Sequence, residues 1–470
     1  MTSTEFRIEH DFLGDREVPT DAYYGIQTLR GKENFHITGM PISREPFFVK
    51  AFGYVKKAAA MANRDLGVLD ANIAGAIIHA CDRLIAGELR QEFITDFIQG
   101  GAGTSTNMNA NEVIANVALE YLGYGRGEYQ HVNPNDHVNF GQSTNDVYPT
   151  ALRLALILRL QSYSHALKLL QEAFVRKGKD FGGVLKMGRT HLQDAVPMSM
   201  GDEFNGWGTT IGEEVSRIAE SRLLLHEINL GATAIGTSVT APPGYPQLAT
   251  RHLSQLTGLD FILAHDLVEA TSDTGVFVQL SGVLKRTAVK LTKVCNDLRL
   301  LASGPRCGLN EIDLPAMQPG SSIMPGKVNP VIPEVVNQAG FLVIGLDTTV
   351  TLAASAGQLQ LNVMEPVIAF SLFLSINAME NAVNSLRTHC VEGITANADR
   401  TRDMVLNSLG IVTLLKPVLG YKLCAEIARE GYRDHKPLRQ IVVEERKLLT
   451  PERWDEIFSF ENLIRPEFAI

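Results

Sequence analysis

Three long stretches of this chain repeat apolar residues at spacings of three and four. The stretches cover residues 152–174, 277–298 and 368–390. Their repeating residues are Leu152, Leu156, Leu160, Tyr163, Leu167, Leu170 and Phe174; Phe277, Leu280, Leu284, Ala288, Leu291, Cys295 and Leu298; and Ile368, Leu372, Ile376, Met379, Val383, Leu386 and Cys390. This spacing places the apolar side chains on one face of a helix. Each stretch therefore predicts one long amphipathic helix.

Two further segments, residues 205–230 and 333–356, also predict helices. The second begins with Pro333, which suits the first position of a helix. Glu334 would then lie in the first turn, where a carboxylate interacts favourably with the helix dipole. Several long helices close together in sequence predict a helix bundle, so the fold is expected to be mainly α.

The segment 339–374 contains so few charged residues that one chain would struggle to cover it. Apolar surface of this extent usually meets another subunit. We therefore expect a homo-oligomer whose helices form a shared core. The alternative is a large monomeric bundle.

Composition restricts the kinds of partner. The chain has 470 residues and a net charge of −9, without any run dense in Lys and Arg. This argues against a nucleic-acid or membrane-surface partner, and an anionic ligand would need local attraction. The longest apolar run without charge, near 366–379, is too short to cross a bilayer, so no membrane segment is expected.

The five cysteines are scattered and show no C-x-x-C spacing. They indicate reduced thiols rather than a disulfide framework or a zinc site. The N-terminal residues have no apolar core typical of a signal peptide, so a cytoplasmic location is expected. His131, Asp136 and His137 match no ligand spacing, and no metal site is predicted.

Residues 320–330 carry the strongest functional signal. They read Gly-Ser-Ser-Ile-Met-Pro-Gly-Lys-Val-Asn-Pro, which combines two hydroxyls, one cation and one amide in a Gly- and Pro-rich loop. Such a loop suits the binding of a small anion, although a structural turn before a helix is the alternative. A phosphate-binding P-loop is excluded, because five residues separate Gly320 from Gly326 and Val328 follows Lys327.

Two other loops lead into helical patterns. Gly100–Asn107 places a glycine run and the Thr104 hydroxyl before one helix, and Ser143, Thr144 and Asn145 precede Pro149 and another. Free N–H groups at a helix N-terminus attract carboxylates and phosphates. Simple helix capping would explain the same residue types.

A further polar loop is expected at 188–194, where Thr190 and His191 follow Arg189. An imidazole there could bind an anion or relay a proton near neutral pH. A lone histidine is more often structural, and the residues alone do not decide between these interpretations.

The 320–330 segment resembles the signature loop of the fumarase/aspartase superfamily, whose members cleave C–N or C–O bonds and release fumarate. The segments 100–112, 142–150 and 188–197 resemble other blocks of the same superfamily. Gly-Gly-Ala-Gly-Thr-Ser at 100–105 and Thr144 are similar to the aspartases rather than to class II fumarases. So are the segments 327–338 and 358–366, whereas Cys307 is fumarase-like.

The resemblance implies a mainly α, three-domain subunit, with boundaries that we set at 1–143, 144–398 and 399–470. It also implies a homotetramer with a twenty-helix core, in which loops of three subunits form each active site. No organic cofactor is expected. Some members of the superfamily are activated by a divalent cation, but we identify no site for one in this sequence.

The implied reaction is the reversible deamination of L-aspartate to fumarate and ammonia. The difficult step removes a proton from C3 and leaves an aci-carboxylate dianion, which needs prearranged donors. The resemblance assigns the base to Ser321; the residues alone do not separate it from Ser322 or His191. It also implies that His191 is catalytic and that Glu334 pairs with it.

The remaining roles also come from the resemblance. The β-carboxylate would be bound by Thr104, Ser143, Thr144 and Ser322, the α-carboxylate by Lys327 and Asn329, and the ammonium by Asn145, Thr190 and His191. Three alternatives stay open at this point. They are a class II fumarase, a lyase for a substituted aspartate, and a non-catalytic oligomer that kept the fold.

Overall fold

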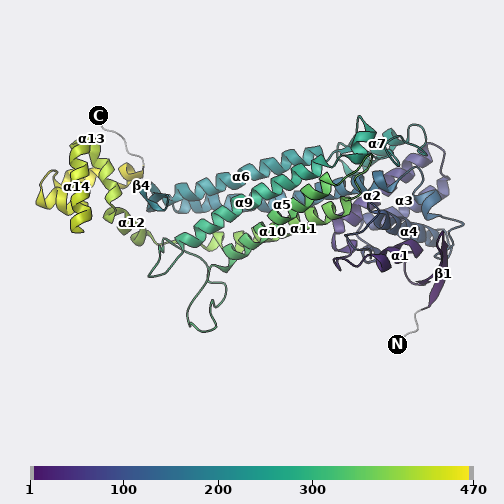
Figure 1. Ribbon diagram of the computed structural model, residues 1–470, viewed down its shortest axis with the longest axis horizontal. Helices are drawn as coiled ribbons and strands as arrows, with labels where there is room; N and C mark the ends of the chain where they lie inside the picture. The colour runs from purple at the N-terminus through teal and green to yellow at the C-terminus, as the bar shows by residue number, and fades with distance from the viewer. Residues whose placement is uncertain (1–4, 465–470) are drawn as a thin grey trace. The chain divides into compact units, whose positions relative to one another are not determined.

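The computed structural model describes residues 5–464 and consists mostly of helices (Figure 1). The chain divides into two compact units. Unit 1 contains Met1–His165, Ser216–Ala288 and Phe341–Glu380, and unit 2 contains Ala166–Val215, Val289–Gly340 and Asn381–Ile470. The three-domain division stays a prediction.

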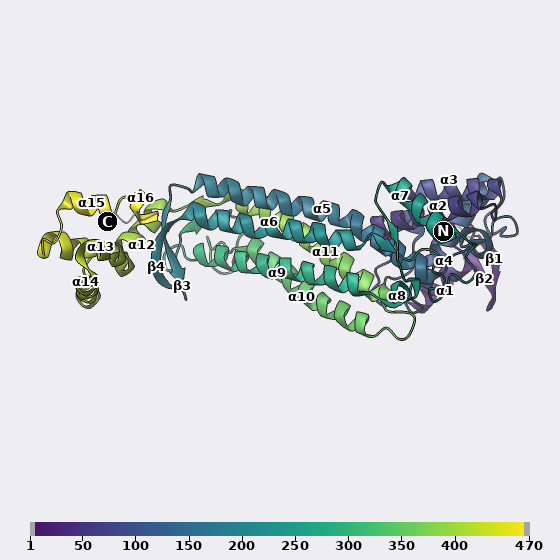
Figure 2. The same cartoon turned by 90° about the horizontal axis from the view of Figure 1, so that it is seen from above.

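Five long helices contribute residues to both units, and all five were predicted, three of them from apolar spacing. They are α5 (Thr144–Asp180), α6 (Met200–Leu224), α9 (Gly275–Leu301), α10 (Val331–Ser355) and α11 (Glu365–His389). Within each unit, segments of these helices lie side by side (Figure 2). The mainly α prediction is confirmed.

Contacts between these helices differ in the two units. In unit 1, Ser281 of α9 donates a hydrogen bond to Asp347 of α10 at 2.8 Å. In unit 2, the ring of Phe174 in α5 packs against Phe204 and Trp207 of α6. Apolar packing and a few buried polar pairs thus fix the helices against one another.

Two helix starts differ from the prediction. α5 begins at Thr144, so Pro149 lies inside the helix rather than before it. Because Pro149 has no N–H, the carbonyl of Asn145 loses its helical partner. The side-chain amide of Asn229 donates to that carbonyl at 3.1 Å instead. α10 begins at Val331, two residues before Pro333, which still falls in the first turn where the N–H needs no helical partner.

The rest of unit 1 is mainly helical. β1 (Phe6–Asp11) and β2 (Gly14–Pro19) form an antiparallel hairpin. α2 packs against α3 and α7, and α3 packs against α4. The elements are α1 (Ile26–Asn34), α2 (Pro46–Asp65), α3 (Ala71–Ile85), α4 (Thr104–Tyr121), β5 (Glu227–Ile228), α7 (Tyr245–Thr257), β6 (Ile262–Leu263) and α8 (Leu267–Ser272).

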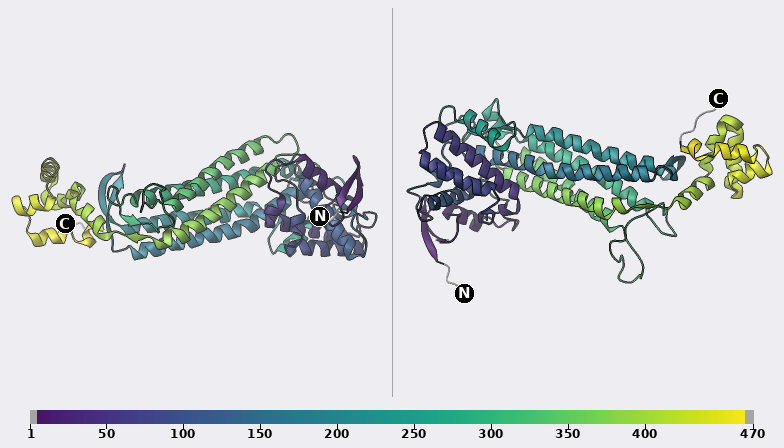
Figure 3. Two further views of the ribbon diagram at one scale, coloured as in Figure 1. Left: turned by 90° about the horizontal axis from the view of Figure 1, so that it is seen from below. Right: turned by 180° about the vertical axis from the view of Figure 1, so that it is seen from behind.

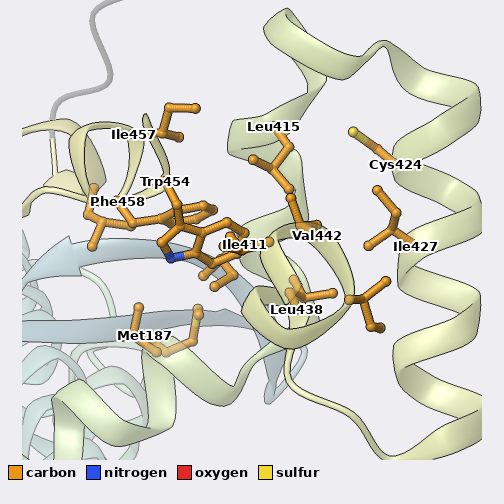
Figure 4. Close-up of a cluster of buried hydrophobic side chains, with 14 of the residues drawn as sticks. Met187, Ile411, Leu415, Cys424, Ile427, Leu438, Val442, Trp454, Ile457 and Phe458 are labelled. Carbon is orange, nitrogen blue, oxygen red and sulfur yellow. The ribbon is translucent and has the colours of Figure 1, made fainter. Parts of the chain in front are cut away.

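Unit 2 contains an antiparallel hairpin of β3 (Leu185–Thr190) and β4 (Gln193–Ser199), and β7 (Ile312–Asp313) pairs with β8 (Thr395–Ala396). After these come α12 (Ala398–Asn407), α13 (Lys416–Leu419), α14 (Tyr421–Asp434), α15 (Pro451–Ile457) and α16 (Phe460–Ile464). Their core is centred on Trp454 and includes Met187 of β3 (Figure 4). Short 3-10 and π turns elsewhere in the chain lie at Ile42–Arg44, Arg90–Glu92, Pro134–Val138, Val391–Gly393, Leu409–Leu415 and Gln440–Glu445.

The segment between β7 and α10 contains no helix or strand among its described residues. It extends as an open loop from the helices of its own unit (Figures 1 and 3). Most of its side chains are exposed, including Ile323 at 83%. This loop carries the 320–330 segment.

Two segments, Val331–Ser355 and Glu365–Gly393, are long and apolar enough to cross a membrane by length and composition alone. This is weak evidence, because core helices of soluble proteins pass the same test. The apolar window of the first segment is only 33% buried. Phe341 and Leu352 of α10 are 60% and 64% exposed, so this helix presents an apolar face without cover from its own chain.

Candidate active site

The first group of predicted site residues lies in unit 1, at the start of α4. The preceding residues Gly101, Ala102 and Gly103 all have positive φ values, and the helix begins at Thr104. The Thr104 hydroxyl is exposed and donates to the carbonyl of Gly101 at 2.7 Å. The tight turn therefore leaves the Thr104 hydroxyl exposed at a helix N-terminus, where the N–H groups of Thr104 and Thr106 already donate to Gly101 and Gln99.

The start of α5 combines capping with half-buried polar groups. The Ser143 hydroxyl accepts from the Asn145 N–H at 3.3 Å, and the Ser143 N–H donates to Asp146 at 3.2 Å. This resembles a capping box, except that the Ser143 hydroxyl accepts from the second helical residue rather than from the third. The Thr144 hydroxyl accepts from the side chain of Asn107 at 3.1 Å. Because Asn107 belongs to α4, this bond joins the first turns of α4 and α5.

Asn145 is held from a different segment of unit 1. Its side-chain amide donates to the carbonyl of Ala234 at 2.7 Å, and its own carbonyl accepts from Asn229. Both partners lie in the polar stretch that follows α6. The structure thus brings together, within unit 1, four predicted residues: Thr104, Ser143, Thr144 and Asn145.

Two buried charged residues support this group, and the sequence reasoning missed both. The Lys56 ammonium donates to Asn139 at 2.9 Å and to Gln142 at 3.0 Å, and burial lowers its pKa to about 7. Asp146 accepts from the Thr233 N–H at 2.8 Å, and burial raises its pKa to about 7. For Lys56, the sequence did offer a signal, namely a lysine on the otherwise apolar face of α2.

Thr190 and His191 occupy the tip of the β3–β4 hairpin in unit 2. The polar loop expected at 188–194 is therefore wrong, because these residues form a strand and a tight turn. Thr190 pairs with Gln193, and the two residues between them, His191 and Leu192, have φ values of 54° and 62°. Left-handed backbone at two consecutive non-glycine residues is uncommon. The turn presents the exposed imidazole at the hairpin tip.

Ser321 accepts two backbone hydrogen bonds inside the open loop. The Met324 N–H donates to its hydroxyl oxygen at 2.9 Å, and the Ile323 N–H donates at 3.2 Å. Donors aimed at an oxygen stabilise its anionic form over its neutral form. The sequence alone could not show these two hydrogen bonds.

The neck of this loop is closed by its own residues. The Gly320 N–H donates to the carbonyl of Lys327 at 2.7 Å, and the Asn329 side chain donates to the carbonyl of Gly320 at 2.7 Å. Ser322 and Lys327 remain exposed. Asn329 thus has a structural role in the loop beside the binding role that the resemblance assigns to it.

The expected pair of His191 and Glu334 does not form within the described residues of one chain. The predicted residues of unit 2 belong to the β3–β4 hairpin and to the 320–330 loop, except Glu334, which lies in the first turn of α10. The predicted catalytic and binding roles of all these residues stay predictions.

Among residues 5–464, no three His, Cys, Asp or Glu side chains gather as a metal-binding group. The histidines considered in the sequence have other partners. His131 stacks on Tyr124 at 3.8 Å between ring centroids, and His137 accepts from the Asn133 N–H at 2.9 Å.

Comparisons with known proteins address the family. Residues 14–345 match the lyase family, and residues 411–465 match the family described as fumarase C C-terminus. An aspartate ammonia-lyase from Helicobacter pylori is 55% identical over 98% of this chain and 98% of its own length. The chain belongs to the aspartate ammonia-lyase family of the fumarase/aspartase superfamily. It is therefore an enzyme, a lyase, and the resemblance found in the sequence is confirmed.

Solved structures agree with this assignment. A fumarate lyase:delta crystallin from Brucella melitensis, crystallised with cobalt, is 50% identical with a TM-score of 0.95, covering 97% of this chain and 99% of its own. A class II fumarase from Schistosoma mansoni has a TM-score of 0.92 at 35% identity, covering 98% and 100%. The fold is thus shared across the superfamily, while sequence identity is higher toward the aspartate ammonia-lyases.

Proposed function

We propose that this enzyme catalyses the reversible deamination of L-aspartate to fumarate and ammonia. The observation that carries the proposal is the 55% identity over 98% of the chain to an aspartate ammonia-lyase, against 35% to a class II fumarase. The aspartase-like residues at 100–105 and Thr144 support the same choice.

In the proposed first step, Ser321 removes a proton from C3 of aspartate. The electron pair of the C–H bond delocalises into the β-carboxylate and gives an aci-carboxylate dianion. The C2–N bond then breaks, the dianion supplies the C2=C3 double bond, and the bond's electron pair leaves with nitrogen as ammonia. The proton on Ser321 finally passes to solvent or to ammonia, which restores the base.

A serine is a poor base unless its alkoxide is stabilised. The two N–H groups of Ile323 and Met324 supply such stabilisation at 3.2 and 2.9 Å. The Lys327 cation lies six residues later in the same loop. These groups support Ser321 over Ser322 as the base, because no hydrogen bond to the Ser322 hydroxyl is present in the described residues.

The growing charge on the β-carboxylate needs donors that are already in place. We assign them to Thr104, Ser143 and Thr144, beside two helix N-termini, together with Ser322. Hydroxyl groups at helix starts strengthen their interaction as negative charge develops. Cooperation between unit 1 and unit 2 residues, contributed by different subunits, is part of this proposal.

We assign further residues to the α-carboxylate and the ammonium group of the substrate. Lys327 and Asn329 bind the α-carboxylate, and Asn145, Thr190 and His191 orient the ammonium. His191 also moves protons at the leaving group, with Glu334 of another subunit as its expected partner. No organic cofactor takes part in these steps.

We further propose a cytoplasmic homotetramer. The exposed apolar face of α10 supports assembly, because 60% exposure of a side chain such as Phe341 is unfavourable in water. The odd, scattered and unpaired cysteines support a reducing compartment.

An ultraviolet absorbance assay for the double bond of fumarate, or of a substituted fumarate, tests the proposed reaction. The purified enzyme is incubated separately with L-aspartate, L-malate, a C3-substituted aspartate and buffer. Fumarate should form from L-aspartate alone. A response to L-malate would identify a fumarase, a response to the substituted aspartate alone would identify a different ammonia-lyase, and no response to any substrate would favour a non-catalytic oligomer.

A further inference from the structure

Glu311 is a buried carboxylate at the base of the open loop in unit 2. Its side chain is 1% exposed, and it immediately precedes β7. Both of its backbone polar groups are hydrogen-bonded. The Glu311 N–H donates to the carbonyl of Leu301 at 2.9 Å, and the Glu311 carbonyl accepts from the Asn397 N–H at 2.9 Å. The chain therefore enters the Ser321 loop from a rigid point.

The carboxylate of Glu311 contacts two cations of the β3–β4 hairpin. Its Oε1 lies 2.5 Å from Nη1 of Arg189, and its Oε2 lies 3.2 Å from Nζ of Lys186. Lys186 also pairs with Glu203. Both cations belong to β3, whose last residue is Thr190. One side chain thus connects the hairpin of His191 to the root of the Ser321 loop.

The hairpin has a special backbone for this contact. In a regular strand, Lys186 and Arg189 would point to opposite faces, because side chains alternate. A shift of register between Met187 and Arg189 breaks the alternation. A bulge of this kind re-aims a side chain, and here both cations reach Glu311. Gly188 lies in the bulge, where a Cβ would stand 2.9 Å from the carbonyl of Val196.

The opposite side of the hairpin is fixed by apolar packing. Met187 faces the C-terminal core near Trp454 and Leu438 (Figure 4). Apolar packing already stabilises the strand, so stability alone gives little reason for a buried ionic group. Replacing a buried ion pair by apolar residues is often neutral or stabilising, whereas a buried pair can specify one arrangement of the chain.

We propose that Glu311 is a positioning residue, which holds the Thr190–His191 hairpin tip in a fixed place relative to the rest of unit 2. This inference rests on the proposed function of His191, but not on the identity of the substrate. Glu311 itself touches neither substrate nor reacting atoms; it acts through Arg189 and Lys186.

The first test is Glu311→Gln, which keeps the shape of the side chain and removes its charge. A displacement of about 1 Å at a catalytic group can lower the rate roughly 10²-fold. We expect kcat to fall by about that factor, with KM for the substrate changed less than about threefold. The matched control is Glu214→Gln, because Glu214 is also buried and lies 2.7 Å from Lys290. That control should lower Tm and leave kcat unchanged.

The decisive test measures Glu311→Gln again in a His191→Ala background. If Glu311 acts through His191, adding Glu311→Gln to the His191→Ala variant should lower kcat by less than about threefold, because the effects of the two substitutions are coupled. A purely structural role predicts the same roughly 10²-fold loss in both backgrounds, which would overturn the proposal. So would an unchanged kcat in Glu311→Gln or in His191→Ala.

A double variant, Arg189→Met/Glu311→Gln, distinguishes a folding defect from a positioning defect. It removes the charges of both Arg189 and Glu311, so neither charge is left buried without its partner. This double variant should regain the Tm of the wild type but not its kcat. Recovery of kcat together with Tm would contradict the proposal. If the wild type converts L-malate rather than L-aspartate, the same cycle is measured with L-malate, so the two proposals fail separately.

Discussion

Gly103 lies directly against the ring of Tyr148. A Cβ on Gly103 would stand 2.2 Å from Cδ2 of that ring, and the residue has a φ of +91°. Gly103 precedes α4, and Tyr148 belongs to the first turns of α5. Absence of a side chain at this position therefore lets the starts of the two helices, with Thr104 and Thr144, approach each other.

Gly103→Ala should destabilise unit 1 and lower activity. The left-handed backbone costs roughly 1–2 kcal/mol with a side chain present, and overpacking against a buried ring typically adds about 1–3 kcal/mol. The matched control is Gly123→Ala, because Gly123 has a φ of +86° with no atom within 4 Å of the added Cβ. Thermal unfolding should show a clearly larger loss for Gly103→Ala. Equal losses would mean that contact with Tyr148 is unimportant.

Ser321→Ala should lower kcat by roughly 10³-fold, the middle of the range for loss of a general base. The side chain lies in an open loop, so Tm and assembly should stay unchanged. In D2O the variant should also stop exchanging the C3 proton of aspartate, as judged by NMR. Ser322→Ala is the control, and it should lower kcat much less than Ser321→Ala does, while exchange continues. Near-normal turnover in Ser321→Ala would rule this residue out as the base.

The long helices were predictable because their signal is local and repeated. Apolar residues at spacings of three and four located α9 and α11 within a few residues of their bounds, and they located the middle of α5. The start of α5 was misplaced, since a proline normally marks a helix boundary. The compensating bond from Asn229 to Asn145 comes from a segment that is distant in sequence.

The hairpin of His191 could not be found by the same reasoning. Its turn places His191 and Leu192 at positions that Asn and Gly usually occupy, so the common signal for a two-residue turn is missing. The contacts of Glu311 with Arg189 and Lys186 join residues more than 100 positions apart. Sequence patterns identified the residue types of the site, whereas long-range contacts determine how those residues are held.

Lys56→Met should change how stability depends on pH. Burial lowers the pKa of Lys56 from 10.5 to about 7, so between these values the unfolded chain binds more protons than the folded chain. The unfolding free energy of the wild type should therefore rise with pH from about 7 to 10.5, at up to about 1.4 kcal/mol per pH unit from this group. The Met variant should lack this rise.

Denaturant unfolding of both proteins at several pH values from 7 to 10 measures the difference. Lys57→Met serves as the control, because Lys57 pairs with the exposed Asp82 rather than lying in the core. Its profile should parallel that of the wild type. Parallel profiles for Lys56→Met and the wild type would show that Lys56 keeps an ordinary pKa.

Phe341→Asp should weaken the proposed tetramer. Phe341 is 60% exposed on α10, and burial of a carboxylate in an apolar interface is strongly unfavourable. Light scattering coupled to size exclusion should show smaller particles with reduced activity. Tyr432→Asp is the control, because Tyr432 is 76% exposed on the separate helix α14. A Phe341→Asp variant that remains tetrameric would exclude this face of α10 from the interface.

Lys327→Met should mainly weaken substrate binding. Lys327 is exposed and forms no ion pair among residues 5–464, so its ammonium is free for the α-carboxylate. That carboxylate keeps its charge throughout the reaction, and its contact stabilises substrate and transition state alike. We expect KM for L-aspartate to rise at least about tenfold, since a charge-assisted hydrogen bond contributes roughly 1.5–3 kcal/mol, while kcat changes less. Steady-state kinetics measures KM and kcat, with the surface variant Lys168→Met as the control. An unchanged KM with a reduced kcat would instead indicate that Lys327 stabilises the alkoxide of Ser321.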